Sequence, residues 1–119
     1  MSLEREPNLT APCRRTMPSK AAFRSQARVI KAIANEARLM IVWRLDEGEC
    51  SAGALAELVG LGPSTVSKHL AVLRAAGIVD DRRDGTTVYY RLLTPCVLTV
   101  LTCAGRVIAD ADADPVALS

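Results

Sequence analysis

The sequence predicts a mostly α-helical domain with one small β-hairpin. Half of its 119 residues are hydrophobic but only 3% are aromatic, which is typical of a single core built from packed helices. Through most of the chain the apolar residues recur with helical spacing. One later segment, DRRDGTTVYYRL, alternates instead, and it contains the Asp-Gly pair that is typical of a hairpin turn.

The first part of the chain predicts a flexible arm followed by two helices. Residues 1–18 contain several prolines and scattered charge, as an extended arm does. Ser19 is a suitable N-cap for a first helix to about residue 34, and Asn35 for a second helix through Leu45. The apolar side chains expected on or beside the inner faces of these helices are Phe23, Val29, Ile30, Ile33, Leu39, Val42 and Trp43.

Two further helices are expected to form a helix-turn-helix. Ser51 can cap a short third helix that Gly60 ends, with three side chains directed inward: Leu55, Leu58 and Val59. Pro63 suits the first turn of a fourth helix that extends to Ala76. Its apolar stripe is formed at i, i+4 and i+7 by Val66, Leu70 and Leu73.

A hairpin and a last helix complete the domain. Gly77 breaks the fourth helix, one strand begins at residues 78–79, and residues 86–92 alternate as the returning strand. Thr94-Pro95 opens a fifth helix to about Ala109, and residues 110–119 are expected to be a flexible acidic tail. The order α-α-α-α-β-β-α over residues 19–109 describes a winged helix-turn-helix, and a chain this small often dimerises.

The charge distribution is compatible with a DNA-binding protein. Residues 1–44 carry nine Lys or Arg against three Glu, whereas residues 45–61 carry four acids and no base. Such a chain can present one basic face although its formal net charge is only +2. No apolar run reaches the roughly 18 residues of a membrane span, and the start has no signal-peptide core, so a cytoplasmic protein is expected.

A polar helix beside a basic hairpin predicts DNA recognition. Short hydroxyl groups can donate and accept at base edges, Lys68 can reach a guanine or a phosphate, and hairpin arginines can contact phosphates. His69 lacks a metal-binding partner one helical turn away, which favours a structural or DNA-proximal role. The alternative is a solvated helix face beside charges that keep an edge strand soluble. The residues expected to bind DNA are Ser64, Thr65, Ser67, Lys68, His69, Arg82, Arg83 and Arg91.

Other functional classes have less support in the sequence. An enzyme is not expected, because no nucleophile–base pair, paired carboxylates or phosphate-binding glycine loop is evident. A protein-interaction module that does not bind DNA would leave the helix-and-hairpin block unexplained.

Three stretches resemble the ArsR/SmtB family of metalloregulatory repressors: KAIANEARLMIVWRL, STVSKHLAVLRAAGIV and DRRDGTTVYYRL. They lie within residues 28–92. The resemblance implies a homodimer that binds an inverted repeat in its own promoter and releases it when an effector binds. Many members hold soft metals through Cys-x-Cys at the third helix, but here Ala52 takes the second cysteine position. Others use His and Asp on the last helix, which contains no histidine here.

The cysteines favour a soft, thiophilic effector. Thiolates without histidine suit As(III) and Sb(III), with Cd(II) and Hg(II) as further candidates, and no permanent cofactor is expected. Cys96 and Cys103 share a helix face but lie ~10 Å apart along the axis, too far for one ion with ~2.3 Å bonds to sulfur. Antiparallel packing of two copies would bring Cys96 of one chain to Cys103 of the other. The candidate ligands are Cys96, Cys103, Cys50 and Cys13.

Alternatives for these thiols stay open. Cys96 and Cys103 are equally suited to a dimer core, because free cysteine packs like a small hydrophobic residue. A repressor of the same fold that senses oxidants or reactive sulfur is the alternative function. The resemblance also implies a site joining an arm cysteine to one at the third helix of the other subunit, which here would be Cys13 and Cys50. As(III) prefers three thiolates, so that pair alone would be incomplete.

Overall fold

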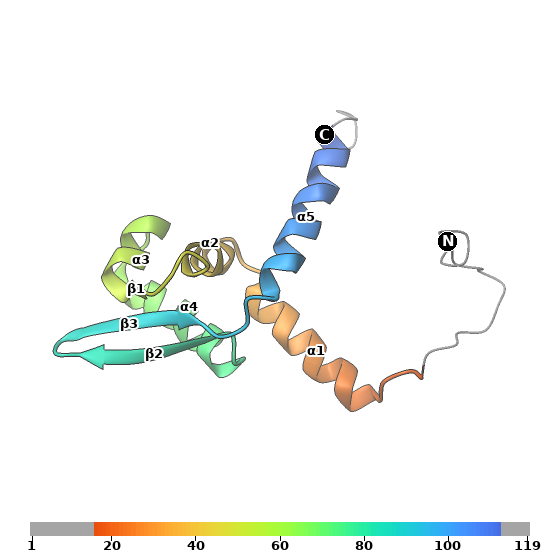
Figure 1. Cartoon of the computed structure of the whole chain (residues 1–119), viewed down its shortest axis with the longest axis horizontal. Coiled ribbons are helices and arrows are strands. Elements are labelled where there is room, and N and C mark those ends of the chain that lie inside the picture. Colours follow the sequence, from red (N-terminus) through yellow and green to blue (C-terminus); the bar gives the residue numbers. More distant parts are fainter. Residues whose placement is uncertain (1–15, 113–119) are drawn as a thin grey trace.

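The computed structural model describes residues 16–112. Its order of elements is the predicted one with a short strand added (Figure 1). The elements are α1 (Lys20–Ile33), α2 (Glu36–Leu45), β1 (Cys50–Ser51), α3 (Ala52–Val59), α4 (Pro63–Ala75), β2 (Val79–Asp84), β3 (Thr87–Leu92) and α5 (Val97–Asp112). None of the helices in this part of the chain is long and apolar enough to span a bilayer.

The predicted starts of the first three helices are confirmed by their capping hydrogen bonds, whereas α5 begins at Val97, after the predicted Thr94-Pro95. The Ser19 side chain accepts a bond from the backbone N–H of Ala22, and the Asn35 side chain accepts bonds from the first turn of α2. Ser51 caps α3 in the same way. Gly60 ends α3 with φ of +78°, a left-handed conformation that glycine adopts without a steric penalty.

The last helix extends beyond its expected end near Ala109 and runs to Asp112. The residues that follow Ala109 explain the difference. They are alanine and aspartate, and the next helix-breaking residue in the sequence is Pro115. Part of the segment predicted as an acidic tail is therefore helical, and the remainder lies outside the described residues.

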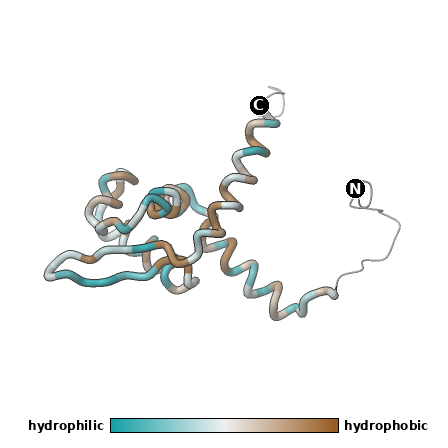
Figure 2. Tube along the Cα trace, viewed as in Figure 1, coloured by the Kyte–Doolittle hydropathy of each residue, from teal (hydrophilic) through white to brown (hydrophobic). Residues whose placement is uncertain are grey.

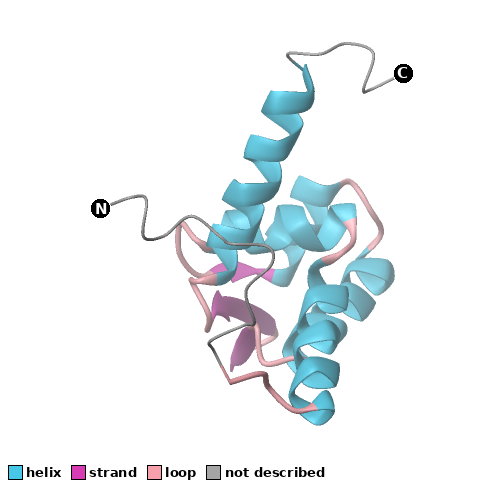
Figure 3. Cartoon of the chain, turned by 90° about the vertical axis from the view of Figure 1, so that its right-hand side faces the viewer, coloured by secondary structure: helices cyan, strands magenta, loops and turns pink. Residues whose placement is uncertain are grey.

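The sheet has three antiparallel strands in the order β1-β3-β2. The hairpin is confirmed, with Val79 opposite Leu92 and Arg82 opposite Tyr89. Strand β1 was not predicted: its two residues pair with β3, Cys50 opposite Tyr90 and Ser51 opposite Tyr89. This pairing fixes the start of α3 beside β3 in the wing, as the hairpin β2–β3 is called from here on. Figure 3 shows the small sheet lying beside the helices.

The core is aliphatic and lies between α2, α3, α4 and the base of the sheet. The stripe predicted on α4 is confirmed, because Val66, Leu70 and Leu73 are fully buried. No aromatic side chain is fully buried in the described residues, in agreement with the composition. The largest fully buried side chains are Ile41, Leu55, Leu70, Leu73, Ile78, Val42, Val66 and Val79.

Several residues predicted to face inward are exposed instead. Trp43 on α2 is 59% exposed and Leu58 on α3 is 43% exposed. On α1 only the last turn reaches the core, so that Ile33 is buried while Phe23, Val29 and Ile30 are exposed. The physical reason on α1 is that this helix, like α5, diverges from the body of the domain (Figure 1), so that the hydrophobic residues along both helices (Figure 2) are left largely in solvent.

Candidate nucleic-acid interface and thiol sites

Helix α4 presents a polar face to solvent. Its apolar stripe anchors it to the core, so the opposite face is turned outward. That outward face begins in the first turn and carries three hydroxyl groups beside an ammonium group within two turns. The predicted base-reading residues are all exposed on α4: Ser64, Thr65, Ser67 and Lys68.

His69 is half-buried at the junction of α4 and α2. Its Nδ1 lies 3.1 Å from Nη1 of Arg38, one of the first residues of α2. Because a guanidinium group only donates hydrogen bonds, Nδ1 accepts and the ring proton of this tautomer lies on Nε2. The contact joins α4 to α2, and it places His69 beside the outward face of α4 instead of at the centre of that face.

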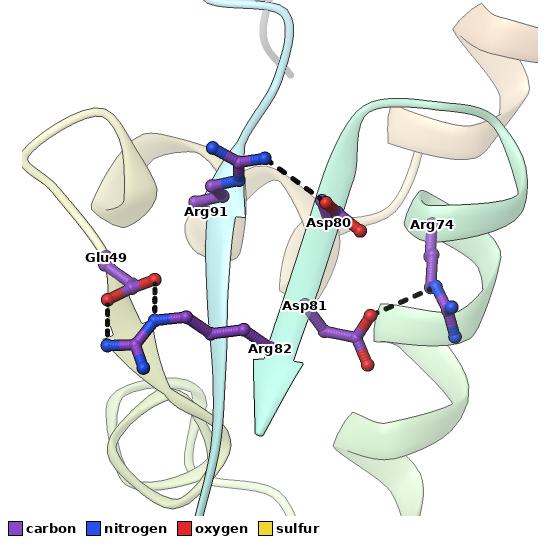
Figure 4. Close-up of polar contacts among 6 residues, drawn as sticks. All are labelled: Glu49, Arg74, Asp80, Asp81, Arg82 and Arg91. Atoms are coloured by element: carbon purple, nitrogen blue, oxygen red, sulfur yellow. Dashed lines mark hydrogen bonds and ion pairs between the residues drawn. The ribbon is translucent and has the colours of Figure 1, made fainter. Parts of the chain in front are cut away.

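Two of the three predicted wing arginines are paired with acids (Figure 4). Arg82 donates two hydrogen bonds to the Glu49 carboxylate, of 2.8 and 2.7 Å, and its guanidinium lies over the Tyr89 ring. Arg91 lies 3.4 Å from an oxygen of Asp80 on the opposite strand. Arg83, by contrast, is exposed and has no ion-pair partner among residues 16–112.

The pKa values of two of these acids are lowered by the groups around them. The hydrogen bonds from Arg82 lower the pKa of Glu49 below its ordinary value of 4.5. The pKa of Asp80 is lowered from its ordinary value of 3.8 mainly by the backbone N–H of Asp81, and next by the hydrogen bond from Arg91.

A third ion pair joins Arg74 of α4 to Asp81 of β2 at 3.2 Å. The base of the wing is therefore held to both α4 and the segment before α3.

The acids of these pairs were not identified from the sequence. The Asp80–Arg91 pair follows from the hairpin register, since these residues are direct partners across the strands, and an Asp-Gly turn suggests such a register. The Glu49–Arg82 pair could not be found this way, because it depends on β1 lying beside β3.

The lowered pKa values give a prediction for Glu49→Gln. A carboxyl whose pKa is depressed in the folded state stabilises that state above its ordinary pKa, and this stabilisation is lost as the pH falls through the folded pKa. The variant is expected to unfold at lower urea concentration than wild type at pH 7, and this difference is expected to be smaller at an acidic pH below 4.5. Urea unfolding followed by circular dichroism at both pH values measures this.

Glu57→Gln is the matched control, because Glu57 is exposed and forms no ion pair with the residues that the structure describes. It is expected to unfold like wild type at both pH values. If Glu49→Gln were as much less stable toward urea in acid as at pH 7, its loss of stability would not come from the ion pair with Arg82.

A groove of about 390 Å³ separates α4 from the wing. Its α4 side includes Ser67, Ala71 and Arg74, and its wing side includes Arg83 and Tyr90. Tyr90 is partly buried, and this burial raises the pKa of its hydroxyl. The groove brings the free wing arginine to the same side of the domain as Ser67.

The cysteines occupy three different environments. Cys96 lies in the turn just before α5, one residue outside the helix in which it was predicted, and Cys103 lies on α5; both are exposed. Cys50 is 6% exposed within the hydrophobic core. Cys13 lies outside the described residues. Within those residues, no three His, Cys, Asp or Glu side chains gather as a metal site would require.

Cys96 lines a shallow groove between α1 and α5. The other side chains of this groove are almost entirely apolar, and they include Val29, Ile33 and Val100. Cys103 follows Val100 by three residues of α5, so its thiol lies on the side of the helix that carries Val100, and Cys96 adjoins that side through the groove that it lines together with Val100. The exposed thiols thus adjoin the uncovered apolar side of α5.

Comparison with known proteins shows similarity to bacterial transcriptional regulators. Residues 33–82 match the model of a helix-turn-helix domain family. The nodulation protein NolR of Rhizobium meliloti is 41% identical over 87 residues, which cover 73% of this chain and 70% of NolR.

Solved structures extend this similarity to the whole domain. The homodimeric winged helix-turn-helix DNA-binding domain Mb0332 of Mycobacterium bovis, described as a possible ArsR-family regulator, matches with a TM-score of 0.64 and 35% identity, covering 82% of this chain and 92% of that one. The antimony-specific transcriptional repressor AntR matches with a TM-score of 0.73 and 29% identity, covering 85% of this chain and 92% of AntR.

Proposed function

The chain belongs to the ArsR/SmtB family of winged helix-turn-helix transcriptional regulators, and from that premise we propose that it is a homodimeric repressor released from its operator by a soft thiophilic ion. The observation that carries the proposal is the pair of exposed thiols beside the uncovered apolar side of α5, in a domain that also exposes a polar recognition helix. As(III) and Sb(III) are the preferred effectors.

Operator binding is assigned to α4 and the wing. The outward face of α4 enters the major groove, where the hydroxyl groups of Ser64, Thr65 and Ser67 and the ammonium group of Lys68 reach base edges or phosphates. Arg83 contacts a phosphate beside that groove, because it is the wing arginine that no acid neutralises in the described structure. A symmetric dimer then requires an inverted repeat, with half-sites about one helical turn of DNA apart.

Dimerisation is assigned to α1 and α5. Both helices leave apolar side chains in solvent: Phe23, Val29 and Ile30 on α1 and Val100, Val107 and Ile108 on α5. Soluble monomers rarely expose contiguous apolar surface of this kind. The homodimeric state of Mb0332 supports a homodimer for this chain.

The effector site is assigned to Cys96 of one subunit and Cys103 of the other. The two thiols of one chain are too far apart for a single ion, whereas antiparallel α5 helices would pair them across the dimer axis. Thiolates prefer soft ions, and the similarity to AntR supports a metalloid effector. The two thiolates are one fewer than As(III) prefers, so the third ligand of the ion would be a hydroxide ion from solvent. Ion binding would draw the α5 helices together and change the spacing of the α4 helices, which weakens the fit to the operator.

The experiment that tests this function is fluorescence anisotropy of the protein on its own upstream DNA. The complex is titrated with As(III), Sb(III), Cd(II), Zn(II) and peroxide under controlled reductant. Release by a soft ion alone is the expected result. Release by peroxide alone, reversed by reductant, would replace the ion with a thiol oxidation switch, and a complex that nothing releases would contradict a sensing role for the thiols.

A further inference from the structure

A stripe of four cations runs along α1. Lys20, Arg24, Arg28 and Lys31 lie at i, i+4, i+8 and i+11, so they share one side of the helix, and all four are exposed. Helix α1 contains no acidic residue. Within residues 16–112, none of the ion pairs involves this set of side chains, which we call the α1 basic stripe.

The C-terminal end of the stripe lies beside the recognition helix. Arg28 and Lys31 line a hollow together with Ala32 of α1, Val72 and Ala75 of α4, and Ala76, which directly follows α4. Val72 follows Lys68 by four residues, so it continues the side of α4 on which Lys68 lies. The stripe therefore continues the basic surface that begins at Lys68.

Helix α4 is consequently flanked on both sides. Its side bearing Ser67 and Arg74 borders the wing, and its side bearing Val72 and Ala76 borders α1. On the wing side three acids neutralise the neighbouring arginines: Glu49, Asp80 and Asp81. On the α1 side, the cations of the stripe form no ion pairs with acids in the described structure. The positive potential is therefore neutralised less on the α1 side of α4 than on the wing side.

A helix seated in the major groove has a phosphate backbone on each side of it. Contacts to these phosphates fix the position of the protein and supply affinity that does not depend on base sequence. We propose that the α1 basic stripe binds the sugar-phosphate backbone of double-stranded DNA on the side of α4 opposite the wing. This inference rests on the proposed operator binding and adds to it a second surface.

Dimerisation leaves this surface open. On the helical wheel of α1, the apolar side chains Val29 and Ile30 lie about 100° or more from Arg28 and Lys31, the cations nearest α4, whereas Phe23 borders the stripe at Lys20. A partner that covers Val29 and Ile30 therefore leaves Arg28 and Lys31 exposed. A dimer would present two such stripes, one from each subunit.

The test compares two double variants on operator and unrelated duplexes. Arg28→Gln/Lys31→Gln removes the two cations nearest α4. Arg44→Gln/Arg106→Gln removes the same charge from α2 and α5, at residues that do not line the hollow. Binding is measured by fluorescence anisotropy between about 50 and 300 mM salt, a range in which phosphate contacts strongly affect affinity. Sedimentation velocity on each protein records its oligomeric state.

The slope of log affinity against log salt is expected to fall by about 0.9 for each phosphate that the variant no longer neutralises, summed over both subunits. This decrease should appear equally on operator and unrelated DNA, while the control keeps the wild-type slope. A stripe variant with the wild-type slope would overturn the inference and leave the proposed repressor intact. Wild-type protein without salt-dependent DNA binding would overturn both, and a stripe variant that dissociates into monomers would reassign the stripe to the subunit interface.

Discussion

The double substitution Val107→Asp/Ile108→Asp is expected to convert the protein to a monomer and to weaken operator binding by about a hundredfold or more. The two side chains are 67% and 57% exposed, so carboxylates are tolerated at these positions in an isolated chain. At a subunit interface the same carboxylates would be buried without partners. A monomer reads one half-site only, which removes the gain in affinity from joining two half-sites.

The measurement combines sedimentation velocity with anisotropy on an operator duplex. Thr102→Asp/Ala109→Asp adds the same charge on the side of α5 away from Cys103 and Val107 and should stay dimeric, since both residues are exposed and lie more than about 90° around the helix from Val107. A monomeric wild type, or a Val107→Asp/Ile108→Asp protein that remains dimeric and binds normally, would show that α5 is not the interface.

The second large effect is expected from Cys103→Ser. Operator affinity should stay within about twofold of wild type, because the residue is exposed and does not contribute to the α4 or wing surfaces. Release by As(III) should be abolished, since each inter-subunit site would keep a single thiolate. Cys96→Ser should behave identically, because both residues belong to the same pair of symmetric sites.

The control is Cys50→Ala, which removes a buried thiol. It is expected to keep release by As(III) while lowering the free energy of unfolding by about 1 kcal/mol, as the removal of a small buried group does. The measurement is DNA release by anisotropy together with bound metalloid per subunit by elemental analysis. If Cys50→Ala abolished release by As(III) while Cys103→Ser kept it, the effector site would lie at Cys50 on β1 and not on α5.

The order of elements was accessible from the sequence because local signals agree with the tertiary structure. Ser19, Asn35 and Ser51 start their helices as the capping rules predict, and the stripe on α4 is buried as its spacing requires. The Asp-Gly pair gives the hairpin. Each of these signals involves residues a few positions apart, so no knowledge of distant contacts was needed.

Features that depend on distant contacts were missed. Strand β1 has two residues and exists because β3 lies beside it, and the Glu49–Arg82 pair follows from that placement. The spacing of Phe23 and Trp43 indicates an apolar side of each helix but not what covers it. Phe23 was expected in an apolar stripe and Trp43 on or beside an inner face, and both are exposed. For the thiols, the sequence identified the candidates, whereas the structure separated the exposed Cys96 and Cys103 from the buried Cys50.

The sparse attachment of α5 to its own domain has a consequence for how such a regulator can diversify. Val97 is buried at its start and Leu98 and Leu101 pack partly against the core, whereas the described residues from Thr102 onward are exposed. Mutations along this outer stretch therefore leave the folding of the DNA-reading body almost unaffected. A change of signal can then accumulate residue by residue on α5, while the operator and the genes under its control stay the same.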